Sequence, residues 1–146
     1  QTSYDVSVRK VWFKGAMKVD ASIDQRIQRT LARIVPADKL HVVKGYFENT
    51  LLASGAKPAS LVHLDCDLYS SALFVMKTLL EKPLVQDGTV LLVDAFNSNR
   101  ANPGMGARRA LTEALAAQQR FRTSEWFSYG WNGQAFLIHD TAPPKA

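Results

Sequence analysis

Two acidic residues each follow a short apolar run, and they are the best candidates for chemistry in this chain. Asp65 comes after Ser60 to Leu64, and Asp94 comes after Thr89 to Val93. Such runs are too short for helices and too apolar for half-exposed strands, so they predict parallel strands covered on both faces. Ligands of open α/β sheets bind beyond the carboxyl ends of the strands. The sequence therefore predicts that Asp65 and Asp94 lie at a binding edge.

The spacing of these two acids suits one crossover connection. Asp65 and Asp94 are 29 residues apart, which accommodates a strand end, a helix and the next parallel strand. The two carboxylates could then converge on one ligand or cation, because carboxylate oxygens are suitable ligands for magnesium. The alternative is that each acid only caps the turn or helix that follows it.

The composition is that of one globular domain spanning residues 1–146. A chain of 146 residues with 47% hydrophobic content can bury one core. Cys66 is the only cysteine, which excludes an intrachain disulfide framework and a cysteine-based zinc site and favours a reducing, cytoplasmic setting. Its acidic neighbours raise the pKa of the thiol, so we expect no nucleophilic role. No apolar stretch reaches the ~20 residues of a membrane span.

The positive charge of the chain is scattered rather than clustered. The net charge is +5, which could indicate an acidic partner such as nucleic acid. However, the arginines recur at helical spacing and no nucleic-acid-binding motif accompanies them, which favours solvated helix faces. We therefore expect no nucleic-acid partner. The arginines in question are Arg26, Arg29, Arg33, Arg108, Arg109, Arg120 and Arg122.

The order of the predicted elements indicates an α/β sheet that is mostly parallel and ends in an antiparallel hairpin. Strands are predicted where apolar runs are short, and helices where apolar residues recur every three or four positions. The predicted elements are a helix from about Ala21 to Val35 closed by Pro36, a strand Leu40–Val43, a strand Ser60–Leu64, a helix from Ser70 or Ser71 to Leu80, a strand Thr89–Val93, a helix from about Met105 to Arg120, and a hairpin of Ser124–Tyr129 and Gln134–His139.

Three segments together resemble a known family. Residues 43–51, 64–71 and 88–94, in this order and spacing, are similar to the macrocin O-methyltransferases. The most specific piece is Asp65-Cys66-Asp67-Leu68-Tyr69-Ser70-Ser71. The resemblance covers about residues 39–139. It implies a Rossmann-like class I methyltransferase sheet and an S-adenosylmethionine-dependent O-methyltransferase that acts on a hydroxyl of a small metabolite or sugar-bearing natural product.

The resemblance also implies roles for individual residues. Gly45, Tyr46 and Phe47 would border the adenine of the cofactor, together with Asp65. Asp65 and Asp94 would hold a magnesium ion, with Asp67 as an alternate ligand. The ion would orient the acceptor hydroxyl and lower its pKa.

Parts of the family pattern are missing from the chain. Ala95 stands where the family commonly has a second acid, and Asn97 or Asn99 could replace that oxygen donor or merely form turns. Upstream there is no glycine-rich turn for the methionine part of the cofactor, although Tyr4 to Val8 alternates like a strand. We therefore expect the C-terminal part of a methyltransferase domain, lacking the first strand and the glycine-rich turn.

Two further questions stay open in the sequence. A preceding segment, or a second copy of the chain in a homo-oligomer, could cover the exposed sheet edge. The alternative function is a non-catalytic interaction domain on the same scaffold. No general base is assigned, because the histidines fall inside strands or near the tail. Three aromatic residues could wall an acceptor pocket or pack against a helix. The histidines are His41, His63 and His139, and the aromatic residues are Trp126, Tyr129 and Trp131.

Overall fold

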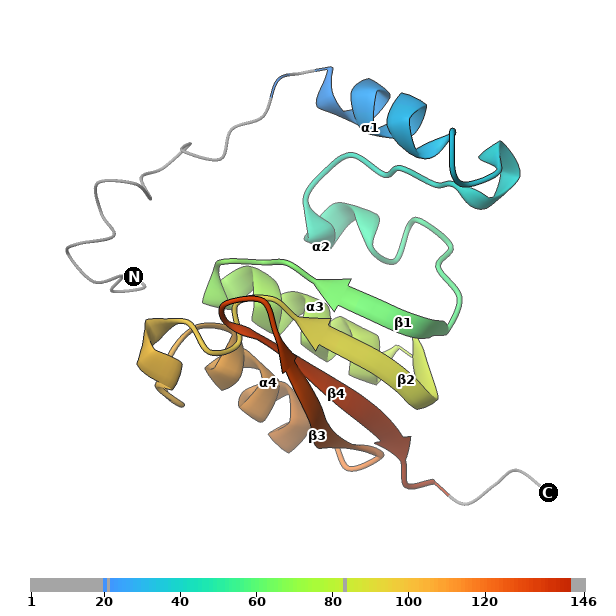
Figure 1. Ribbon diagram of the computed structural model, residues 1–146. Coiled ribbons are helices and arrows are strands. Elements are labelled where there is room, and N and C mark those ends of the chain that lie inside the picture. The colour runs from blue at the N-terminus through green and yellow to red at the C-terminus, as the bar shows by residue number, and fades with distance from the viewer. Residues whose placement is uncertain (1–19, 21, 83, 143–146) are drawn as a thin grey trace. The chain divides into compact units, whose positions relative to one another are not determined.

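The computed structural model describes residues 20, 22–82 and 84–142 (Figure 1). These residues fall into two compact units, which we describe separately. One contains residues 20 and 22–54, and the other contains residues 55–82 and 84–142. The expected single domain over residues 1–146 stays a prediction, and the strand-like alternation of Tyr4 to Val8 lies outside the described residues.

The larger unit is built on a four-stranded mixed sheet in the order β1-β2-β4-β3. β1 and β2 are parallel, whereas β4 pairs antiparallel with both β2 and β3. The mixed α/β sheet with a terminal hairpin is therefore as predicted, although antiparallel pairs outnumber the parallel pair among the described strands. The strands are β1 (Ala59–Leu64), β2 (Val85–Val93), β3 (Phe121–Tyr129) and β4 (Gly133–Asp140).

Two helices pack against each other and cover one face of this sheet (Figure 1). They are α3 (Tyr69–Glu81) and α4 (Gly106–Ala116), and their small alanines at positions 72, 107, 110 and 114 are almost fully buried. The opposite face differs from the prediction, because Leu61 is 58% exposed and His63 is also exposed. The reason is that both helices of this unit lie on the same face. No helix among the described residues is long and apolar enough to cross a membrane.

The smaller unit is helical. It contains α1 (Ile23–Leu31), the 3₁₀-helix η1 (Ala37–Lys39) and α2 (Phe47–Thr50). Asp20 Oδ1 accepts hydrogen bonds from Ser22 N at 2.7 Å and Ser22 Oγ at 2.6 Å, ahead of the first turn of α1, and no side chain of the described residues caps the amides of that turn. The helix ends at Leu31 rather than Val35, since the turn that follows bonds back to Leu31 O ahead of Pro36.

The predicted strand Leu40–Val43 is wrong. Residues 40–43 contain no helix or strand, and Val43 is 52% exposed. Apolar β-branched residues favour an extended backbone, but a strand also needs a hydrogen-bonded partner. The described part of this unit contains no strand that could be that partner.

A buried threonine joins the start of β2 to β1. Thr89 is fully buried, and its Oγ1 donates to Ala59 O at 2.6 Å and accepts from Gln86 N at 3.0 Å. These bonds span the irregularity in the β1–β2 pairing, where Gly88 has a φ of 78°.

Replacing Thr89 with valine should lower the free energy of unfolding by about 1–3 kcal/mol, because the carbonyl and the amide lose their partner inside the protein. Thr112→Val is the matched control, since Thr112 is exposed and bonds only within its helix; we expect a change within about 0.5 kcal/mol there. Urea denaturation measures both, and equal losses would contradict the role given to Thr89.

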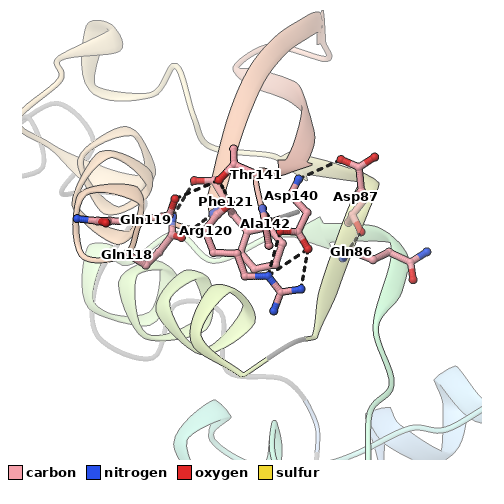
Figure 2. Close-up of polar contacts among 10 residues, drawn as sticks. Gln86, Asp87, Gln118, Gln119, Arg120, Phe121, Asp140, Thr141 and Ala142 are labelled. Atoms are coloured by element: carbon pink, nitrogen blue, oxygen red, sulfur yellow. Dashed lines mark hydrogen bonds and ion pairs between the residues drawn. The ribbon is translucent and has the colours of Figure 1, made fainter. Parts of the chain in front are cut away.

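Polar contacts join the C-terminal end of β4 to the start of β3 and to β2 (Figure 2). Arg120 and Asp140 form a bidentate ion pair with distances of 2.6–3.1 Å. Asp140 N donates to Asp87 Oδ1 at 3.0 Å, and Gln118 bonds to both backbone groups of Phe121. The polar groups at this end of β4 are therefore paired with one another.

Candidate functional site

The carboxyl ends of β1 and β2 bring Asp65 and Asp94 to one edge, as the sequence predicts. Leu64 pairs with Val93, so the residue after each strand end is an aspartate. Asp94 N also donates to Leu64 O at 3.0 Å, which extends the pairing by one residue. Both aspartates are exposed. We call Asp65, Asp67 and Asp94 the acidic edge.

The three carboxyl groups of the acidic edge influence one another electrostatically. Burial raises the pKa of Asp67, and the charges of Asp65 and Asp94 raise it further. A carboxylate with a raised pKa accepts a proton more readily than an ordinary one. The edge can therefore attract a cation and can take up a proton.

The carboxylate oxygens of this edge are few, so they suit only a cation that keeps part of its water shell. Among the described residues, no group of three His, Cys, Asp or Glu side chains could hold a metal ion. Magnesium, however, is commonly bound through one or two carboxylates and several waters, and Asp65 and Asp94 supply that number. Asn97 is not a free oxygen donor, because its Oδ1 accepts from Arg108 Nη2 at 2.5 Å.

Cys66 lies between two of these acids and is half-buried. Burial, followed by the charges of Asp65 and Asp67, raises the pKa of the Cys66 thiol to about 11. The nucleophilic role is therefore not expected, because the thiolate is scarce at neutral pH.

Alkylation of Cys66 by iodoacetamide should be slow. At pH 8 in EDTA, a thiol with this pKa should react about 100-fold more slowly than an ordinary exposed cysteine in a peptide, because about 100-fold less of it is thiolate. The rate should keep rising with pH up to about 11. Mass spectrometry of quenched samples measures it, and a plateau near pH 9 would contradict the environment described.

The loop after β2 is fastened to the β3–β4 hairpin. Asn97 N donates to Asn132 O at 2.8 Å, and the buried Phe96 ring packs edge-on against Phe136 at 4.8 Å between ring centroids. The guanidinium group of Arg108 lies over the Phe96 ring, 4.3 Å from the ring centroid. The first residues of the loop that follows β2 are thus anchored to the hairpin.

The aromatic residues of the hairpin divide into exposed and enclosed ones. Trp126 and Trp131 are 58% and 99% exposed. Tyr129 is partly buried and its ring centroid lies 6.2 Å from that of His63. Burial raises the pKa of Tyr129, followed by the charges of Asp94 and Asp65. Tyr129 is therefore the hairpin aromatic that faces the acidic edge.

A family model for macrocin O-methyltransferases matches residues 21–120. The chain belongs to the macrocin O-methyltransferase family. The match contains both strand ends that carry the acidic edge, together with α3 and the whole loop that follows β2. No curated protein sequence matches the chain.

Two solved structures share the fold of this family member. One is an O-methyltransferase from Bacillus cereus in complex with SAH, with a TM-score of 0.63 and 16% identity, covering 84% of this chain and 60% of that chain. The other is the SAH-bound Podospora anserina methyltransferase PaMTH1, with a TM-score of 0.58 and 16% identity, covering 84% of this chain and 58% of that one. The class I methyltransferase fold is thereby confirmed. The chain matches about three-fifths of the length of these proteins.

The remaining residues that the family resemblance singles out belong to the helical unit. Gly45 has a φ of 147°, and a Cβ there would approach Thr50 Cγ2 to 2.6 Å, so glycine is required. Tyr46 precedes α2 and is 80% exposed, and Phe47 begins this helix and is 42% exposed. Because this unit is described by itself, it stays a prediction that these three residues and Asp65 bind one cofactor.

Two sequence hypotheses about polar residues can now be refined. His41 lies outside any strand, whereas His63 is on the exposed face of β1 and His139 Nε2 is 2.8 Å from Ser124 Oγ. No general base is assigned from these positions. Tyr129 is one of the three aromatic residues expected either to wall an acceptor pocket or to pack against a helix, and it is the one that lies near the acidic edge.

Proposed function

We propose that this chain is part of an S-adenosylmethionine-dependent O-methyltransferase that methylates a hydroxyl of a small metabolite or sugar-bearing natural product. The observation that carries the proposal is the pair of adjacent strand ends bearing Asp65 and Asp94 in a member of the macrocin O-methyltransferase family. The names of the two structural neighbours support S-adenosylmethionine as methyl donor, since both were solved with its product SAH.

The proposed reaction is a direct displacement. The acceptor oxygen forms a bond to the methyl carbon while the bond from that carbon to sulfur breaks, and the hydroxyl proton is released. The acidic edge contributes by positioning the hydroxyl and by offering carboxylates that can receive the proton. Asp65 and Asp94 would hold magnesium, which when bound lowers the pKa of the acceptor hydroxyl.

The acceptor should be uncharged near its reacting hydroxyl. Three carboxyl groups gather at this edge, and the nearby Arg108 is already engaged with Asn97 and Phe96. An anionic substituent beside the reacting oxygen would meet repulsion from the edge. A cytoplasmic location is part of the proposal on the strength of the single free cysteine, Cys66.

Calorimetric titration with S-adenosylmethionine, in magnesium and then in EDTA, tests the proposal. We expect binding in magnesium that weakens on chelation. Binding that is indifferent to EDTA would remove the metal and keep the methyl donor. If no heat of binding is seen under either condition, the non-catalytic interaction domain, which Ala95 favours, becomes the better account.

A further inference from the structure

The backbone of the hairpin places the ring of Tyr129 beside Asp94. Tyr129 ends β3 and pairs with Gly133, the first residue of β4. Because Val93 pairs with Gln134 in the antiparallel β2–β4 ladder, Gly133 lies opposite Asp94. A Cβ at Gly133 would come within 2.6–2.8 Å of three carbons at the far end of the Tyr129 ring. The ring therefore lies across Gly133, and only glycine allows it to do so.

The same face of the sheet carries the two aspartates. His63 pairs with Leu92, so these residues share a face, and residues two further along each strand emerge on that face again. Those residues are Asp65 and Asp94. The Tyr129 ring is on this face too, since its centroid is 6.2 Å from that of His63. The sheet thus gathers a phenol and two carboxylates above one strand end.

The Tyr129 hydroxyl is buried and has no hydrogen-bond partner among the described residues. A buried hydroxyl without a partner costs about 1–3 kcal/mol, and most buried polar groups of native proteins have one. A tyrosine hydroxyl keeps its proton at neutral pH, so it can donate. An anionic partner would be repelled by Asp65 and Asp94, which leaves a neutral oxygen.

We propose that Tyr129 is a positioning residue of the acidic edge, whose hydroxyl donates a hydrogen bond to the water or acceptor hydroxyl carried by a divalent cation at Asp65 and Asp94. This inference rests on the proposed function. It adds a hydrogen-bond donor beside Asp65 and Asp94, where Ala95 supplies no polar side chain. It also explains why a tyrosine is folded over Gly133 in a hairpin whose two tryptophans are exposed.

Manganese binding to the wild-type chain and to Tyr129→Phe, measured by calorimetry, tests the inference. The variant keeps the ring on Gly133 and removes only the hydroxyl. We expect manganese affinity to fall about 10-fold or more, as happens when an outer-sphere partner of a metal site is removed. The melting temperature should stay equal or rise, because an unpartnered buried hydroxyl is gone. Tyr69→Phe is the matched control, since the Tyr69 hydroxyl bonds to Glu113 on the helix layer; its manganese affinity should equal that of the wild type.

Each other outcome overturns the inference in a distinct way. Equal manganese affinity in Tyr129→Phe and the wild type would refute it while leaving the metal site standing. A lower affinity accompanied by a lower melting temperature would assign Tyr129 a packing role instead. If the wild type binds no manganese, the cation of the proposed function fails and this inference fails with it.

Discussion

Asp94→Asn should slow methyl transfer by about 100-fold or more and weaken manganese binding by at least about 10-fold. The amide keeps the shape of the side chain but loses the charge that a divalent cation or an acceptor hydroxyl would meet. Asp65→Asn should have the same effect, because Leu64 and Val93 pair and the two side chains share one edge. A 100-fold loss corresponds to about 2.7 kcal/mol of transition-state stabilisation.

The measurement uses radiolabelled S-adenosylmethionine and an acceptor that the wild-type protein methylates. Asp38→Asn is the matched control, since Asp38 makes only a solvent-exposed ion pair with Lys39 at 3.6 Å; we expect no change in rate there. Folding should not account for the loss, because removing one of three clustered negative charges relieves repulsion. Wild-type rates in both edge variants would show that the acidic edge does no chemistry.

Phe121→Ala should lower the free energy of unfolding by about 3–5 kcal/mol. The Phe121 side chain is completely buried at the start of β3 and is the largest fully buried side chain of the described core. Its loss removes apolar burial and leaves a cavity in a sheet-and-helix core. This is a large share of the roughly 5–15 kcal/mol that stabilises a typical domain.

Phe127→Ala, in the same strand, is the matched control for that loss. Phe127 is 43% exposed, so its truncation should cost about 1 kcal/mol or less. Urea denaturation followed by circular dichroism gives both values. Equal losses in the two variants would mean that the core is not centred where the structure places it.

The parts of the fold that sequence reasoning predicted are those set by local pattern. The strand ends before Asp65 and Asp94 follow from uninterrupted apolar runs, and the hairpin follows from two alternating segments around Gly130. Element boundaries were less accurate: the strand expected at Ser124 starts at Phe121, and the helix expected to reach Arg120 ends at Ala116. Those limits depend on hydrogen bonds such as the ones Gln118 makes to Phe121.

Features that depend on distant partners could not be predicted in the same way. Leu40–Val43 has strand-forming residues, but whether it is a strand depends on a neighbour that local pattern does not reveal. The position of Tyr129 follows from its pairing with Gly133 and from the pairing of Gln134 with Val93. No periodicity within one segment contains that information. The acidic edge was therefore predictable, whereas the strand pairing that selects Tyr129 from the three candidate aromatic residues was not.

The strand order has a consequence for how the molecule is made. β4 is the last of the described strands in sequence, yet it lies in the interior of the sheet, between β2 and β3. During synthesis, the backbone groups of β2 and β3 that pair with β4 stay unpaired until residues 133–140 have left the ribosome. The sheet therefore closes in one late step rather than strand by strand. A nascent chain stalled before Gly133 should be recognised by chaperones, whereas one in which a linker of a few dozen residues follows Ala146 should already resist proteolysis.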